Sequence, residues 1–161
     1  MAKTDNATIG ACGEHYVASY LSGFKLLVAM PRAGIPGSDL FVSNVAKGPA
    51  IRVQVKTGTQ SYAKTKVDGE IYLWHASTKA TANVSPFQWY AFVWLNGWPS
   101  SENQPKVFIV PSYFVAERVQ GCVDRNEWLC FWMTLPESAA YEGTSGMNAL
   151  LKCLNSEAIQ S

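Results

Sequence analysis

Residues 51–57, IRVQVKT, decide the fold that this sequence predicts. Branched apolar and polar residues alternate along this stretch, and a period of two is the pattern of a β-strand with one face in the core. The isoleucine and the two valines share the buried face, and the other face carries Arg52, Gln54 and Lys56. Residues 39–44 predict a second strand, joined to the first by a connection of hairpin length. We therefore expect the two strands to pair antiparallel.

An acid, an amide and an amine come together in this hairpin and predict a divalent-cation site. Asp39 begins the first strand, and the two-residue spacing of Gln54 and Lys56 puts both on one face of the second, where Asp39 can face them. Magnesium and similar hard cations take oxygen ligands, which the Asp39 carboxylate, the Gln54 amide oxygen and the backbone carbonyl of Val55 would supply. Waters would complete the shell, and Lys56 would lie beside one of them.

A helix is predicted before the hairpin. In residues 6–22, apolar and tyrosine side chains recur at helical spacing, and a glycine follows them. Gly10 and Gly13 weaken such a helix by roughly 1 kcal/mol each relative to alanine, which suggests that they permit close packing or that the helix starts late. Residues 24–29 predict a short strand, and the polar residues 58–69 predict an irregular stretch.

Buried strands and two helices are predicted in the second half of the chain. Residues 89–95 and 106–110 are continuous apolar runs, which is typical of central strands covered on both faces. Residues 70–74 predict a further strand. Ser112 is expected to cap a helix that continues to about residue 120, and residues 148–159 predict a closing amphipathic helix.

The composition is that of a globular protein with one domain over residues 1–161. Hydrophobic residues make up 48%, yet no apolar run approaches the roughly 18 residues that cross a bilayer. The N-terminus lacks the apolar segment of an export signal, so a cytoplasmic location with reduced cysteines is expected. The four cysteines include no Cys-x-x-Cys pair, and with only two histidines a structural zinc site is not expected. Among the tryptophans, Trp128 is expected in the core, whereas Trp74 is a candidate for exposure.

Positive charge gathers in the first half of the chain. Residues 1–80 hold nine Lys and Arg against five Asp and Glu, and residues 81–161 hold four against seven. A basic half favours a polyanionic partner, since such side chains bind phosphates. Lys79 flanks the candidate site and is one residue that could meet phosphates. Further candidates for phosphate contacts are Arg32, Lys47, Arg52, Lys64 and Lys66.

Five short segments carry a resemblance to a known family. They are GEHYVASYL at 13–21, Gly23-Phe24, Pro31-Arg32, Ser38-Asp39-Leu40 and IRVQVKT at 51–57. In this order they resemble the PD-(D/E)xK nuclease superfamily. More narrowly, the sequence is similar to the branch with glutamine in place of the second acid, PD-(D/Q)xK, which includes a group I intron homing endonuclease and many uncharacterised bacterial proteins. The motif-bearing part covers roughly residues 10–57, and the later apolar runs resemble the family's core strands less specifically.

The resemblance implies a restriction-endonuclease-like fold, a three-layer α/β/α sandwich with a mixed central β-sheet. It implies DNA as the partner and phosphodiester hydrolysis with Mg²⁺ or Mn²⁺ as the cofactor. By matching position, Asp39 would be the metal-binding aspartate, Gln54 the replacement for the second acid and Lys56 the catalytic lysine. Glu14 would be the acid on the first helix. A protein with one such site cuts one strand per visit, so double-strand cleavage would need a homodimer or larger homo-oligomer.

The same residues also have plainer interpretations. Asp39 could cap a turn, Gln54 and Lys56 could lie on an ordinary solvated strand face, and Glu14 could be a surface helix residue. Their joint order and spacing favour the nuclease interpretation. Ser38 stands where the family name has proline, and the neutral Gln54 removes one charge from the site. The alternatives are therefore a catalytically degenerate nucleic-acid-binding or partner-binding protein on the same fold, or a subunit that acts through a protein partner.

Overall fold

A five-stranded mixed sheet forms the middle layer of the protein, which a computed structural model describes for residues 5–31, 37–44 and 50–156. Its strands are β1 (Leu26–Ala29), β2 (Leu40–Asn44), β3 (Ile51–Gly58), β6 (Gln88–Trp94) and β7 (Lys106–Pro111). They follow the order β1-β2-β3-β6-β7; β3 and β6 pair parallel, and the other neighbours pair antiparallel. The predicted hairpin is confirmed, because Leu40 of β2 lies opposite Val53 of β3 in an antiparallel ladder.

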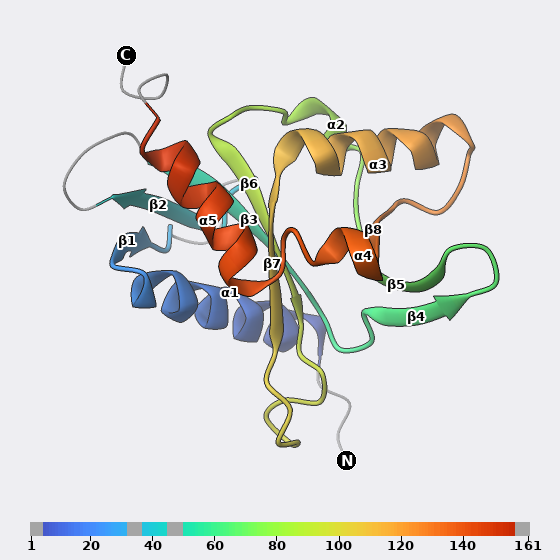
Figure 1. Ribbon diagram of the computed structural model, residues 1–161, viewed down its shortest axis with the longest axis horizontal. Coiled ribbons are helices and arrows are strands. Elements are labelled where there is room, and N and C mark those ends of the chain that lie inside the picture. The colour runs from blue at the N-terminus through green and yellow to red at the C-terminus, as the bar shows by residue number, and fades with distance from the viewer. Residues whose placement is uncertain (1–4, 32–36, 45–49, 157–161) are drawn as a thin grey trace.

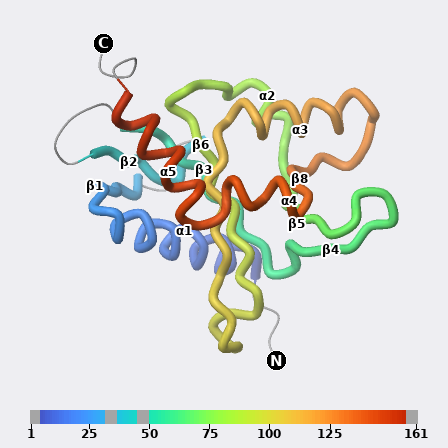
Figure 2. The backbone as a smooth tube through the Cα atoms, viewed as in Figure 1, coloured from blue at the N-terminus to red at the C-terminus, as the bar shows by residue number. Residues whose placement is uncertain are grey.

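Helices cover both faces of this sheet, so the predicted three-layer α/β/α sandwich is confirmed (Figure 1). On one face lie α1 (Asn6–Gly23) and α5 (Gly143–Leu154), and on the other α2 (Lys79–Ala82) and α3 (Ser112–Asp124). In Figures 1 and 2, α5 lies to the left of β7 and α3 to the right. The first face is filled by apolar side chains of the two helices, among them Val17, Leu21, Met147 and Leu150.

A second, smaller sheet packs on the face that α3 covers. It consists of β4 (Tyr62–Thr65), β5 (Gly69–His75) and β8 (Cys130–Thr134), in the order β4-β5-β8, and the short helix α4 (Leu135–Ser138) follows β8. The prediction of an irregular stretch over residues 58–69 is wrong, since β4 lies within it. The strand β8 is not among the predicted elements. Its residues are mostly apolar, and it pairs antiparallel with β5, which is distant in the sequence.

Aromatic side chains fill the space between the two sheets. Phe92, Phe108 and Phe131 are at most 1% exposed, and Trp74 is 4% exposed among them. The indole N–H of Trp74 donates to the carbonyl oxygen of Val93 at 3.0 Å. The expectation that Trp74 is exposed is therefore wrong. The expectation that Trp128 lies in the core is also wrong, since Trp128 is 60% exposed. The pairing of β5 in the small sheet decides which of its side chains face the core, and the local sequence does not reveal this pairing.

The apolar strand β7 lies at the end of the sheet and not in its centre. Residues 107–111 are nevertheless buried, because α5 covers one face of the strand and α3 with the small sheet covers the other. The segment before α5 covers its outer edge. The N–H of Ile109 donates to the carbonyl oxygen of Tyr141 at 2.9 Å, and Phe108 forms a bridge with Glu142. A continuous apolar run therefore indicates burial here without indicating a central position.

The boundaries of α3 and α5 differ from those that the sequence predicts, and α3 continues to Asp124 instead of about residue 120. Pro111, and not Ser112, occupies the cap of α3, and Ser112 is the first helical residue. The Ser112 hydroxyl accepts from the N–H of Ser85 at 3.0 Å and donates to its carbonyl oxygen at 2.9 Å, so it ties the helix to the segment before β6. The closing helix α5 begins at Gly143 instead of residue 148. It ends at Leu154, with Asn155 as its C-cap, so the predicted end at residue 159 is wrong; residue 159 itself lies outside the described residues.

None of the helices in the described ranges has the length and apolar character that a bilayer span requires. All four cysteines lie in these ranges and carry free thiols. Two of them are neighbours, because Cys122 on α3 and Cys130 at the start of β8 bring their sulfur atoms within 4.0 Å.

The close approach of α1 to β3 depends on Gly13. A Cβ atom at this position would lie 1.8 Å from Oγ1 of Thr57 and 2.8 Å from its Cβ, so a hydrogen atom is the largest substituent that fits. A Cβ atom at Gly10 would meet nothing within 4 Å. Close packing therefore accounts for the glycine at position 13 but not for the one at position 10. The contact between Gly13 and Thr57 also brings the next residue, Glu14, toward β3, the strand that carries the polar residues.

We expect Gly13→Ala to lower the free energy of unfolding by about 1–3 kcal/mol, the usual cost of overpacking. Gly10→Ala is the matched control and should raise it by about 0.5–1 kcal/mol, since alanine is the better helix former and its methyl group meets open space. Urea unfolding followed by circular dichroism measures both changes. Equal effects of the two substitutions would contradict the close contact between α1 and β3.

Candidate active site at the sheet edge

The carboxylate of Asp39 occupies the edge of β3 at the point where β2 begins. Asp39 directly precedes β2, and its N–H donates to the carbonyl oxygen of Val53 at 3.1 Å. The next N–H on this edge belongs to Val55, and it donates to Oδ2 of Asp39 at 2.7 Å. The side chain thus continues the hydrogen-bond ladder beyond the backbone of β2.

Gln54, Val55 and Lys56 meet Asp39 at this edge. Gln54 and Lys56 are partly buried, and Nε2 of Gln54 donates to the same Oδ2 of Asp39. Val55 is 6% exposed and turns its side chain to the core. The N–H and C=O of one strand residue point to the same side, so the Val55 carbonyl faces the edge that Asp39 occupies. The structure therefore brings together the hairpin residues that the sequence singles out.

Burial sets the protonation behaviour of the two carboxyl groups at this edge. Burial raises the pKa of Asp39 above its ordinary value, while the hydrogen bond from Val55 and the positive charge of Lys56 lower it. Burial also raises the pKa of Glu14 on α1; the negative charge of Asp39 raises it further, and His15 opposes this. Since charge–charge interaction weakens with distance, Glu14 is near enough to Asp39 for the two charges to interact.

Two carboxylates that repel each other suit a cation. The part of the chain that the structure describes contains no cluster of three or more His, Cys, Asp or Glu side chains. A metal ion would therefore take two carboxylates at most, and Mg²⁺ is commonly held by one or two carboxylates and several waters. Asp39, Glu14 and the Val55 carbonyl are the oxygen donors that such an ion would use here. Gln54 would donate its oxygen only after its amide group turned over, because its nitrogen faces Asp39.

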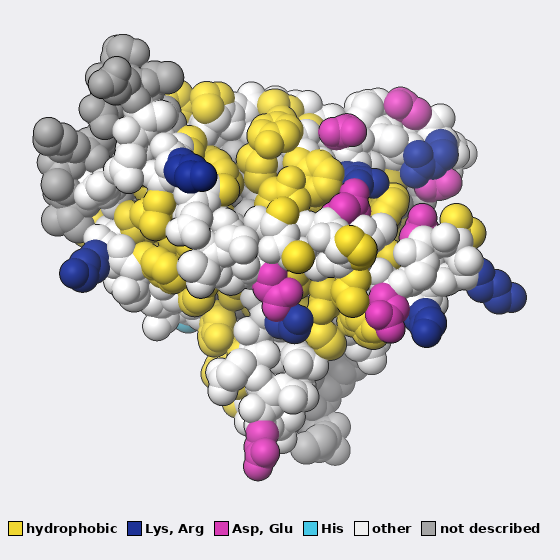
Figure 3. Space-filling model, viewed as in Figure 1, with side chains coloured by type: hydrophobic (Ala, Val, Ile, Leu, Met, Phe, Trp, Pro, Cys, Tyr) yellow, Lys and Arg dark blue, Asp and Glu magenta, His cyan; other side chains and the backbone are white. Residues whose placement is uncertain are grey.

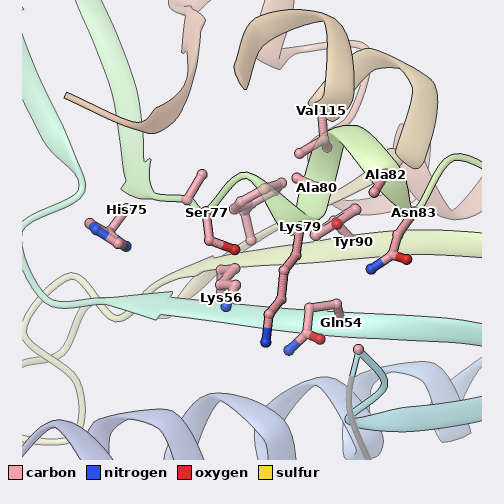
Figure 4. A pocket seen from close by; sticks show the side chains of 13 residues that line it. Gln54, Lys56, His75, Ser77, Lys79, Ala80, Ala82, Asn83, Tyr90 and Val115 are labelled. Carbon is pink, nitrogen blue, oxygen red and sulfur yellow. The ribbon is translucent and has the colours of Figure 1, made fainter. Parts of the chain in front are cut away.

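A cavity of about 560 Å³ opens beside Gln54 and Lys56, next to helices α2 and α3. Lys79 on α2 extends across it toward Gln54 and Lys56 (Figure 4). The sequence indicates Lys79 as a residue that flanks the site, and it gives no signal for the other polar residues of the lining. These come from the end of β5, the segment after it, the segment after α2 and β6, which only packing brings to β3: His75, Ser77, Asn83 and Tyr90.

The other predicted phosphate contacts are dispersed. Arg52 is exposed on β3, on the same face as the polar site residues. Lys64 on β4 and Lys66 in the turn after it are exposed, and neither lines the cavity. Arg32 and Lys47 lie outside the described residues. Basic and acidic side chains are intermixed on the face that Figure 3 shows, so the basic balance of residues 1–80 does not produce a basic surface there.

Because folding raises the pKa of Asp39, its ionised form costs stability at neutral pH. This cost is absent below the ordinary pKa of 3.8 and grows as pH rises through the higher pKa of the folded protein. Without metal, we expect Asp39→Asn to raise Tm by about 1–3 °C at neutral pH, and the gain to shrink toward pH 4. The asparagine oxygen can still accept from Val55. Calorimetry across this pH range measures the effect, and a lower Tm for the variant would contradict it. Asp68→Asn, at an exposed turn, is the control.

Comparison with known proteins bears on the fold. No protein-family model matches the sequence, and no curated protein matches it. The structure is similar to the solved structure of a bacterial homing endonuclease, with a TM-score of 0.62 and 14% sequence identity. The match covers 99% of this chain and 100% of that chain. At this identity the likeness concerns the fold alone, and the three-layer sandwich of this protein is a nuclease-like α/β fold.

Proposed function

We propose that the protein is a metal-dependent DNA endonuclease whose active site lies at the edge of β3. One observation carries this proposal. The Asp39 carboxylate accepts a hydrogen bond from the N–H of Val55, and the positive charge of Lys56, the next residue of β3, acts on the same carboxylate. Glu14 interacts with this carboxylate from α1. The similarity to the fold of a homing endonuclease, over almost the whole chain, supports the same conclusion.

Each site residue has a role in this proposal. Asp39 and Glu14 would hold Mg²⁺ or Mn²⁺ together with the Val55 carbonyl. Such an ion supplies Lewis-acid stabilisation of the charge that develops on the phosphate oxygens. Lys56 would donate hydrogen bonds to the phosphate and orient the attacking water. The water oxygen bonds to phosphorus, the bond from phosphorus to the leaving sugar oxygen breaks, and the proton lost by the water is balanced by one that the leaving oxygen takes up.

The glutamine at position 54 bears on whether this site cuts DNA or only binds it. A neutral amide in the place of a second acid weakens the attraction for a cation, and Glu14 would have to compensate. The amide of Gln54 also donates to the Asp39 carboxylate and so satisfies it in the absence of metal. This hydrogen bond favours the alternative function, a protein that binds nucleic acid or a partner without cutting.

Cleavage of supercoiled plasmid, single-stranded DNA and branched DNA tests the proposal. We expect nicking with Mg²⁺ or Mn²⁺ and none with EDTA. Asp39→Ala and Lys56→Ala should each lower the rate by at least about a hundredfold, as the loss of one transition-state contact does. Lys152→Ala is the matched control. Lys152 is exposed on α5, which covers the face of the sheet opposite to the one that carries Gln54 and Lys56. Gel electrophoresis separates nicked from linear product, and linear product would indicate that two copies of the chain act together.

Two results decide between the functions. Activity of Asp39→Ala equal to that of the wild type would refute the proposed site. Folded protein that binds DNA but cuts none of the substrates with any metal would establish the catalytically degenerate alternative.

Metal binding can be measured without DNA. An ion that binds only the folded state stabilises it by about 2.7 kcal/mol at a hundred times its Kd. We therefore expect saturating Mg²⁺ to raise Tm of the wild type and to leave that of Asp39→Asn unchanged. Gln54→Glu should enlarge the rise, because it adds a carboxylate beside Asp39. The same rise in all three proteins would show that Mg²⁺ binds elsewhere.

A further inference from the structure

The cavity beside Gln54 and Lys56 extends the candidate active site toward α2 and α3. Its volume, about 560 Å³, is within the roughly 300–1,000 Å³ of sites that bind small molecules. It is larger and less polar than a phosphate group alone requires. Buried apolar and aromatic side chains form its floor: Ala76, Ala80, Tyr90, Phe92 and Val115.

The charged residues that line the cavity are basic. Lys56 comes from β3, and Lys79 comes from α2 and reaches across the opening toward it (Figure 4). His75 lies at one end of the lining and Asn83 at the other. Among the described residues that form this lining there is no Asp or Glu. The cavity therefore favours an anionic group at its mouth.

We propose that the cavity receives one unstacked nucleotide of a DNA strand, with its base on the apolar floor and its phosphate between Lys56 and Lys79. This inference rests on the proposed function and adds the class of ligand, a nucleoside with its phosphate. It also makes Lys79 a binding residue of the active site.

The base of a nucleotide matches the apolar floor of the cavity, and its phosphate matches the two lysines at the mouth. Tyr90 and Phe92 lie side by side in the floor, with ring planes 12° apart and centroids separated by 5.8 Å. Phe92 is 1% exposed and stacks on Phe131, so Tyr90 is the aromatic side chain of the floor that is left for contact with a base. Burial raises the pKa of Tyr90, so its hydroxyl stays protonated at neutral pH and can donate to the edge of a base. Unstacking a base costs free energy, and contacts with this floor and with the two ammonium groups would offset it.

A free nucleotide has the same chemistry as a nucleotide within a strand, and the geometry favours the strand. Gln54 and Lys56 line the cavity and also flank the Asp39 carboxylate. A phosphate held by Lys56 therefore lies next to the residues that would cut it. A strand that runs along the edge of β3 would bring such a phosphate and its base to the cavity together.

Nuclear magnetic resonance on the isotope-labelled full chain, in EDTA, tests the cavity without cleavage. Thymidine 5′-monophosphate and deoxyadenosine 5′-monophosphate are the probes. We expect them to shift the backbone amide signals of Ala80, Asn83 and Tyr90. Inorganic phosphate and thymidine should each bind at least about tenfold more weakly, because each lacks half of the contacts. No shifts at the cavity, or equal binding of phosphate alone, would overturn the proposal.

Two substitutions with matched controls locate the binding. Ala82→Phe at the exposed end of α2 should block the cavity and abolish the shifts, whereas Ala139→Phe, at the exposed residue after α4, should not. Lys79→Gln should weaken nucleotide binding by about tenfold, the usual loss for a hydrogen bond to a charged group. Lys152→Gln should leave it unchanged. Weakening by the control substitutions to the same degree would count against the cavity.

Single-stranded DNA identifies the source of the nucleotide. A short oligothymidylate should displace thymidine 5′-monophosphate, and an abasic oligomer of equal length should not. If neither displaces it, the ligand is a free nucleotide and the proposal for a strand is wrong. Cavity binding by a protein that cuts no DNA would overturn only the proposed function, whereas cutting without cavity binding would overturn only this inference.

Discussion

The hydrogen bond from the Val55 N–H to the Asp39 carboxylate is the contact on which the site depends. It forms because β2 pairs with β3 in a register that sets Leu40 opposite Val53, which leaves the next edge group of β3 to a side chain. A shift of one residue in this register would turn Gln54 and Lys56 into the core. The buried side chains of β3 prevent such a shift, since Ile51 and Val53 have no exposed surface.

This arrangement brings together two carboxyl groups, those of Asp39 and Glu14, whose negative charges repel each other. Burial raises the pKa of both Asp39 and Glu14, and the charge of Asp39 raises that of Glu14 further. In the absence of a cation, their ionised forms oppose folding at neutral pH. The core must supply the compensating stability, and the tight contact of Gly13 with Thr57 is part of it. Strain of this kind is expected where a site is organised for binding.

The two faces of β3 have different tasks. One face packs under α1 and α5 and holds the strand in place. The other face is covered only in part, because α2, α3 and the small sheet leave a cavity over Gln54 and Lys56. The cavity and the edge that carries Asp39 therefore share two residues of β3, Gln54 and Lys56, so a ligand in the cavity would lie next to the Asp39 carboxylate.

Local patterns in the sequence were sufficient to predict α1, the antiparallel hairpin, the apolar strands β6 and β7, and the meeting of Asp39 with Gln54 and Lys56. These features follow from a period of two in a strand or 3.6 in a helix and from a short connection. The tertiary structure alone decided how β4, β5 and β8 pair in the small sheet, the burial of Trp74, the exposure of Trp128 and the cavity that Tyr90 lines. Each of these depends on contacts between segments far apart in the chain, and a periodic pattern carries no information about which distant segment will cover it.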